Sequence, residues 1–135
     1  MVEPALVESV PSLAGLPEAA RADLAAAFDE IDVPAGARLL SQGDFAYEIF
    51  AILEGIAQVE EDGSVVATLE RGDLFGEIGL LLTGRRTAAI VAQTPMRLLA
   101  LFDQTFRRLC SQYPELSRVV HAQSRGRFPG SRSSP

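Results

Sequence analysis

The sequence has no lysine, and it has only one cysteine (Cys110) and one histidine (His121) among its 135 residues. A single cysteine excludes an internal disulfide and is typical of a reducing compartment, so we expect a cytoplasmic protein. A single histidine argues against a histidine-lined metal centre, so we expect no metal and no metal-dependent enzyme of the cupin type. No apolar run reaches the ~18 residues that cross a bilayer, and the first residues are acidic, so we expect neither a membrane span nor a signal peptide.

The charges are divided unevenly along the chain. Residues 1–84 contain sixteen acidic residues and three arginines, a balance of −13, and residues 85–135 contain nine arginines and two acidic residues, a balance of +7, which gives the total of −6. A net acidic chain without a basic stripe is a poor binder of DNA or RNA, so we expect no nucleic-acid partner. Every Lys or Arg position is an arginine, and the planar guanidinium is suited to bidentate contacts with phosphate or carboxylate.

The order of the expected elements is helix, many short strands, then helix. Apolar residues at helical spacing predict an N-terminal amphipathic helix over residues 17–31. Asp62-Gly63 between two β-forming runs predicts a hairpin. The expected strands lie at residues 47–53, 56–60, 64–70, 87–93 and 96–102, and two C-terminal helices are expected at 103–113 and 114–125. We predict a mostly β fold with flanking helices: an antiparallel, jelly-roll-like β-roll with an N-terminal helix and two C-terminal helices.

The stretch FGEIGLLLTGRRTAAIVA, residues 75–92, is the part that carries chemistry. We expect a short helix over residues 76–82, whose unpaired N–H groups attract an anion and whose glycines let a ligand approach. Arg86 then supplies a guanidinium, and Thr87 a hydroxyl, to the same anion. Glu77 would repel a lone phosphate, but it suits a ligand that also offers a hydroxyl donor, as a ribose does. The pattern therefore favours a nucleotide whose phosphate is folded back onto its sugar.

This stretch resembles the phosphate-binding cassette of cyclic nucleotide-binding domains, the family of bacterial catabolite activators, protein kinase A regulatory subunits and cyclic nucleotide-gated channels. PAGARLLSQGD, YEIFAILEGIAQV and LERGDLFGE extend the likeness over residues 13–125. The resemblance implies that Glu77 binds the ribose 2′-hydroxyl and Arg86 the cyclic phosphate. It further implies that Thr87 contacts the phosphate or the base. Backbone groups are implied for Gly76, Ile78 and Gly79, a base pocket for Val59, Ala67 and Leu69, and contact with the base for Arg127.

The chain departs from the family pattern at two positions. Gly79 stands where alanine is more common, and Arg85 stands where proline is common. Neither change removes a binding group, and both are expected to loosen the loop when no ligand is bound. Arg85 is expected to be a solvated surface charge rather than a ligand contact.

The expected function is that of a cytoplasmic sensor domain, not an enzyme. It would bind a 3′,5′-cyclic nucleotide, cAMP in preference to cGMP, need no cofactor, and move its C-terminal helices on binding. The expected partner is an effector protein or a second copy of the chain. The alternative is a degenerate domain that kept the fold, lost the ligand and acts as a protein interaction module. Residues 1–12 are expected to be an N-terminal segment, 13–125 the domain, and 126–135 either a tail or a lid.

Overall fold

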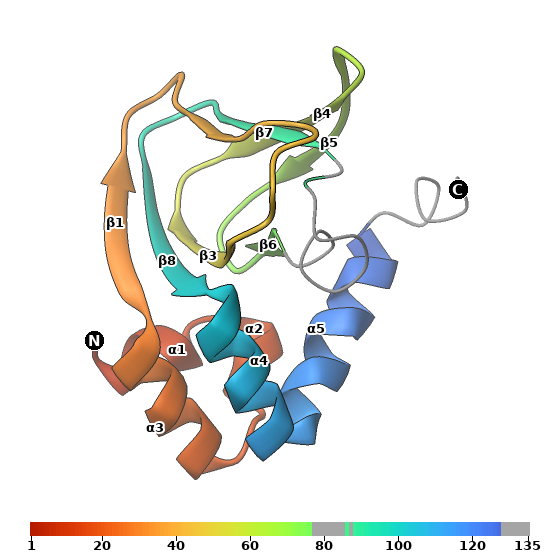
Figure 1. The fold of residues 1–135 in the computed structure, drawn as a ribbon. Coiled ribbons are helices and arrows are strands. Elements are labelled where there is room, and N and C mark those ends of the chain that lie inside the picture. Colours follow the sequence, from red (N-terminus) through yellow and green to blue (C-terminus); the bar gives the residue numbers. More distant parts are fainter. Residues whose placement is uncertain (77–85, 87, 128–135) are drawn as a thin grey trace.

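The computed structural model describes residues 1–76, 86 and 88–127, with side chains up to Gln123. Two four-stranded antiparallel sheets form a roll, and helices pack at one end of it (Figure 1). The strand orders are β1-β8-β3-β6 and β2-β7-β4-β5. The predicted fold class is therefore confirmed.

Eight strands make up the roll, and most are short. Between them lie turns with glycine at positive φ, which only a residue without a Cβ adopts readily. The strands are β1 (Asp29–Val33), β2 (Arg38–Leu40), β3 (Glu48–Glu54), β4 (Ala57–Glu61), β5 (Ser64–Leu69), β6 (Leu74–Phe75), β7 (Ala89–Ala92) and β8 (Met96–Phe102).

The hairpin predicted at Asp62-Gly63 is present between β4 and β5. Glu61 lies opposite Ser64 in the register of the two strands. Asp62 and Gly63 have φ values of +52° and +83°. Positive φ at both central residues is the signature of the type I′ turn, whose twist matches that of the flanking strands.

Within the described residues, five helices flank the roll. The two C-terminal helices are confirmed close to their predicted bounds, while the first two helices were not predicted from the sequence. The helices are α1 (Pro4–Glu8), α2 (Pro11–Ala14), α3 (Glu18–Ala27), α4 (Asp103–Gln112) and α5 (Pro114–Arg127).

The N-terminal amphipathic helix is shorter than predicted. The prediction carried it to Ile31, but α3 ends at Ala27, Phe28 is extended, and the next residues form β1. β1 pairs along its whole length with β8, from Asp29 opposite Ala100 to Val33 opposite Met96. Backbone pairing with a distant strand overrides the local helical pattern here, which sequence periodicity cannot anticipate. The helix predicted over residues 76–82 lies almost entirely outside the described residues.

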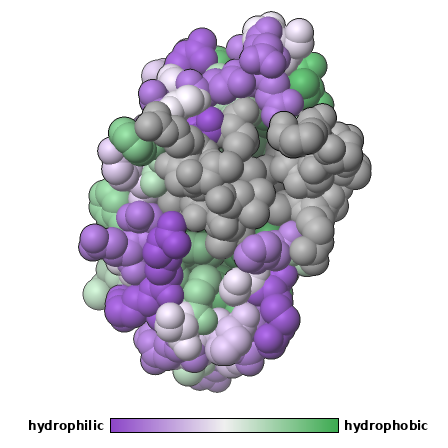
Figure 2. Space-filling view, turned by 45° about the vertical axis from the view of Figure 1, so that its right-hand side comes forward, coloured by the Kyte–Doolittle hydropathy of each residue, from purple (hydrophilic) through white to green (hydrophobic). Residues whose placement is uncertain are grey.

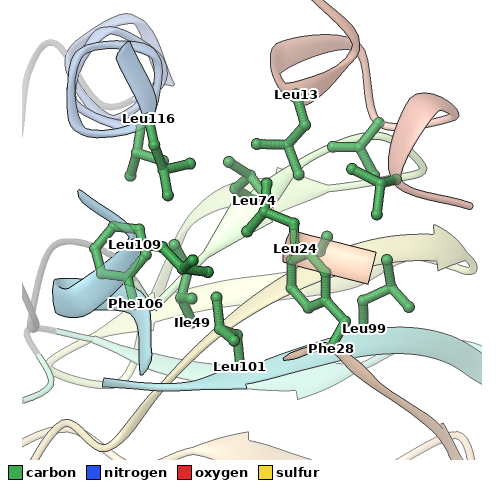
Figure 3. Close-up of a cluster of buried hydrophobic side chains, with 14 of the residues drawn as sticks. Leu13, Leu24, Phe28, Ile49, Leu74, Leu99, Leu101, Phe106, Leu109 and Leu116 are labelled. Carbon is green, nitrogen blue, oxygen red and sulfur yellow. The ribbon is translucent and has the colours of Figure 1, made fainter. Parts of the chain in front are cut away.

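Strand β3, in the sheet β1-β8-β3-β6, is buried on both faces. Alternate residues of β3 point to opposite sides: Ile49 and Ala51 pack toward the helices, and Phe50 and Ile52 pack into the roll. Figure 3 shows the helix-side cluster, where Leu109 and Leu116 from the C-terminal helices meet residues of the sheet. Because helices cover one face and the second sheet covers the other, β3 reads as an almost continuous apolar run.

The surface is mixed in character. Figure 2 shows hydrophilic residues over much of the described surface, with smaller hydrophobic areas between them. None of the helices in the described part of the chain is long and apolar enough to cross a membrane.

Candidate functional site

Arg86 is the buried charged residue of the described chain, with 6% of its side chain exposed. It lies between β6, the last strand in the order of the first sheet, and β7, a strand of the second sheet. Its Nη1 donates a hydrogen bond of 3.0 Å to the carbonyl oxygen of Gly76. Burying a guanidinium is costly unless it is paired and hydrogen-bonded, and the Gly76 carbonyl supplies one such bond.

The backbone of Arg86 is fixed by the loop between β2 and β3. The N–H of Gly43 donates a hydrogen bond of 2.9 Å to the carbonyl oxygen of Arg86. The N–H of Arg86 donates one of 2.7 Å to the carbonyl oxygen of Asp44. These reciprocal bonds anchor the residue as firmly as a strand pair would. The guanidinium therefore extends from a backbone that is held in place.

Gly76 must be glycine for two reasons that the structure makes visible. Its φ is +90°, and a Cβ on it would lie 2.8 Å from the carbonyl oxygen of Glu48 and 2.9 Å from Nη1 of Arg86. The preceding residue, Phe75, is stacked on Phe50 with ring centroids 4.9 Å apart, which fixes the approach of the chain. The sequence analysis assigned the small size of Gly76 to the approach of a ligand. The structure adds that Arg86 itself occupies the space beside it.

An open cavity of about 440 Å³ reaches Arg86 from the side of β2. This volume lies within the range of small-molecule sites. Most of the residues that line this cavity were not predicted as site residues from the sequence. Several of them lie in PAGARLLSQGD, a stretch that resembles the cyclic nucleotide-binding family. The lining residues are Arg38, Leu39, Leu40, Ser41, Asp44, Phe45, Tyr47, Glu48 and Arg86.

The three residues expected to line a base pocket lie together on β4 and β5. Val59 is directly opposite Ala67, and Leu69 is opposite Ala57. Val59 and Leu69 belong to the hydrophobic cluster inside the roll, and Ala67 packs against it. They do not line the cavity beside Arg86, so the role expected for them stays a prediction.

Five other predicted residues cannot be placed at the site. Glu77, Ile78, Gly79 and Thr87 lie outside the described residues. Arg127 is the last residue of α5, but its side chain is not among those described. Their roles also stay predictions.

Two chemical alternatives can be examined in the described residues. There, no group of three or more His, Cys, Asp or Glu residues is arranged to hold a metal ion. Cys110 packs against the helix-side cluster, and burial raises the pKa of its thiol to about 11 although Arg107 acts in the opposite direction. A raised pKa lowers the fraction of the thiolate, which is the nucleophilic form, as is typical of a packed thiol.

The sequence model of the cyclic nucleotide-binding domain matches residues 30–113, more than half of the chain. The chain belongs to the cyclic nucleotide-binding domain family. The match includes the loop that anchors Arg86, Gly76 and both sheets of the roll.

Known relatives of this cyclic nucleotide-binding domain include kinase subunits and channels. The cAMP-dependent protein kinase regulatory subunit of Schizosaccharomyces pombe is 34% identical over 87% of this chain and 29% of its own length. A cyclic nucleotide-gated potassium channel of Rhizobium etli is 33% identical over 85% of this chain and 32% of its own length. The chain therefore spans about a third of the length of these relatives.

Solved structures share the fold at lower identity. A putative cyclic nucleotide-binding protein from Geobacter metallireducens has a TM-score of 0.84 at 22% identity, covering 95% of this chain and 99% of its own. A regulatory subunit of a cAMP-independent protein kinase A from Trypanosoma brucei has a TM-score of 0.82 at 22% identity, covering 90% and 44%. At these identities the likeness supports the fold and not the ligand.

Proposed function

We propose that this domain binds a 3′,5′-cyclic nucleotide and that Arg86 holds the cyclic phosphate. The observation that carries the proposal is the burial of Arg86 beside an open cavity, with its backbone tied to the loop at Gly43 and Asp44. A guanidinium fork in a partly desolvated cup is suited to a phosphate. Nη1 of Arg86 already donates a hydrogen bond to the Gly76 carbonyl oxygen, so the guanidinium is oriented before a ligand binds.

The neighbouring residues complete the proposed site. We assign the ribose 2′-hydroxyl to Glu77, and backbone contacts to Gly76, Ile78 and Gly79. Thr87 is assigned to the phosphate or the base. The base is assigned to the apolar surface of β4 and β5 and to Arg127; the strand residues are Val59, Ala67 and Leu69.

Cyclic AMP is the ligand we favour, with cyclic GMP as the alternative. The two share sugar and phosphate, so Arg86 and Glu77 cannot distinguish them, and the choice depends on contacts to the base. The similar proteins from Schizosaccharomyces pombe and Aspergillus niger are regulatory subunits of cAMP-dependent protein kinase, which supports cAMP as the ligand of this chain. We propose no enzymatic activity, and an effector protein as the recipient of the signal.

Calorimetry with cAMP, cGMP and a cyclic dinucleotide tests the ligand, and Arg86→Ala tests its position. We expect Arg86→Ala to lose about 2–5 kcal/mol of binding free energy, because the phosphate charge is left unpaired in a buried site. Arg71→Ala is the matched control: it removes the same charge from an exposed position, and we expect unchanged affinity. Equal losses in both variants would indicate a diffuse electrostatic attraction and refute the assignment. No heat with any of the three nucleotides would refute ligand binding itself.

A domain that kept the roll without the ligand is the second candidate. The regulatory subunit of a cAMP-independent protein kinase A from Trypanosoma brucei shares this fold, which makes the alternative specific. Thermal unfolding separates the two, since a ligand at a hundred times its Kd adds ~2.7 kcal/mol to stability. An unchanged Tm at millimolar cAMP would favour the second candidate.

We also propose that ligand binding moves the C-terminal helices. Tyr113, between α4 and α5, donates a hydrogen bond of 2.6 Å from its hydroxyl to Asp23 of α3. Pro114 follows and begins α5, so the junction is a defined point about which α5 can reorient. We expect saturating cAMP to change amide exchange in α5 and to leave α3 unchanged. Identical exchange of α5 with and without bound cAMP would contradict the movement.

A further inference from the structure

The exposed aromatic rings of the described chain gather in one place. Phe45, Tyr47 and Phe102 are 55%, 59% and 59% exposed. The rings of Phe45 and Tyr47 are in contact, with centroids 6.3 Å apart. The N–H of Asp103, the residue after Phe102, donates to the carbonyl oxygen of Tyr47 at 2.8 Å. We call these three residues the aromatic patch.

The aromatic patch adjoins the cavity beside Arg86. Phe45 and Tyr47 line this cavity, and Phe102 lies directly opposite Glu48, another lining residue, in the register of β3 and β8. Paired residues of an antiparallel sheet project to the same face, so the Phe102 ring lies on the Glu48 side. Clustered exposed rings next to a cavity are typical of protein interfaces, where aromatic side chains and arginine are enriched.

Charged side chains of both signs lie beside the patch, and they do not form ion pairs with one another in the described residues. Arg38 and Asp44 both line the cavity, and both are exposed. Among the described residues, neither side chain takes part in an ion pair, and neither does Glu48. An arginine and carboxylates on one surface, unpaired internally, can pair across an interface between two copies.

A two-fold interface requires a surface that is complementary to itself. The aromatic patch meets this requirement, since rings can stack on rings and Arg38 of each copy can meet Asp44 of the other. A partner that was purely basic would be repelled by Arg38 and Arg86, and a purely acidic one by Asp44 and Glu48. We propose that this surface binds a second copy of the chain, forming a symmetric dimer with the aromatic patch at its centre.

The size of the patch indicates a weak dimer. Three rings that are each more than half exposed offer roughly 300 Å² of apolar surface per copy. Stable complexes bury about 1,200–2,000 Å² in total, so the patch alone supports association only at high concentration. The expected Kd lies at about 0.1–1 mM.

Sedimentation equilibrium from 20 μM to about 1 mM, without nucleotide, tests the proposal with charge-reversed variants. Arg38→Glu and Asp44→Arg each place like charges opposite one another, so we expect each variant alone to weaken dimerisation at least tenfold. Mixing the two variants places opposite charges together again and should restore a heterodimer. Arg71→Glu, an exposed reversal outside the patch, is the control and should dimerise as the parent does.

Each outcome is decisive, and none depends on ligand binding. A parent chain that stays monomeric at 1 mM overturns the proposal. So does a dimer that neither reversal weakens, because its interface then lies elsewhere. Weakening by both variants without recovery on mixing overturns the pairing of Arg38 with Asp44. Circular dichroism of each variant establishes that the fold is retained, and failure of cAMP to bind would affect only the function proposed above.

Discussion

The two hydrophobic clusters on either side of the sheet β1-β8-β3-β6 differ in what encloses them. The helix-side cluster lies between five helices and one face of the sheet (Figure 3). The roll-side cluster lies between the two sheets, and it includes Val59 and Leu69, to which we assign the base, and Leu40, which lines the cavity. Arg86 follows β6 on the roll side. The helix-side cluster includes Leu116 and Val120 of α5, while the roll-side cluster borders the space in which we place the ligand.

The largest expected effect is loss of stability on the helix side. Phe106 is 2% exposed in α4, and Phe106→Ala should lower the free energy of unfolding by about 3–5 kcal/mol, because a buried ring is replaced by a cavity. Urea denaturation measures the loss. Phe102→Ala removes the same ring from an exposed position nearby and should cost less than about 1 kcal/mol. The folded fraction of Phe106→Ala should still bind cAMP with parental affinity; a large loss of affinity would show that the clusters are not separate in function.

A smaller effect is expected from Gly76→Ala on the roll side. The change combines a strained φ of +90° with contacts of 2.8 and 2.9 Å to Glu48 and Arg86, so we expect a loss of about 1–3 kcal/mol in stability together with weaker cAMP binding. Gly36→Ala is the control, since its φ is +87° and its Cβ would meet nothing within 4 Å. It should cost stability through strain alone and leave affinity unchanged. If both variants bind cAMP equally, crowding of Arg86 does not matter.

Cys110 reports how closed the helix-side cluster is. Burial raises the pKa of its thiol from 9.0 to about 11. At pH 8 its thiolate should therefore be one to two orders of magnitude rarer than in the unfolded chain, and alkylation by iodoacetamide correspondingly slower. Alkylation as fast in the native protein as in urea would show an open cluster.

The raised pKa of Cys110 predicts that the free energy of unfolding decreases between pH 9 and pH 11. The unfolded chain loses the thiol proton near pH 9 and the folded chain only near pH 11. Cys110 therefore stabilises the fold equally at all pH values below 9, and this contribution is lost as the pH rises from 9 to 11. Cys110→Ala should flatten the decrease in the free energy of unfolding over that interval. An identical slope in parent and variant would contradict the assignment.

Elements that depend on local signals could be predicted. The Asp62-Gly63 turn needs two adjacent residues that tolerate positive φ, and α4 shows the spacing of Phe106 and Leu109, so both were recognised. The end of α3 was not, because β1 forms through pairing with β8 some seventy residues later in the chain. Likewise, the two-residue strand β6 has no periodicity of its own and exists only because β3 pairs with it.

Residue type and spacing were enough to predict the class of fold and the turn at Asp62-Gly63, and to propose Arg86 as the residue for an anion. How Arg86 is held could be seen only in the folded chain, where strand pairing brings the loop at Gly43 and Asp44 and the carbonyl of Gly76 to it. The same holds for the aromatic patch, in which strand pairing places Phe102 opposite Glu48, next to Tyr47, although these residues are far apart in the chain. Spacing encodes local conformation, but long-range pairing places separate segments beside one another, and no short window of sequence contains that information.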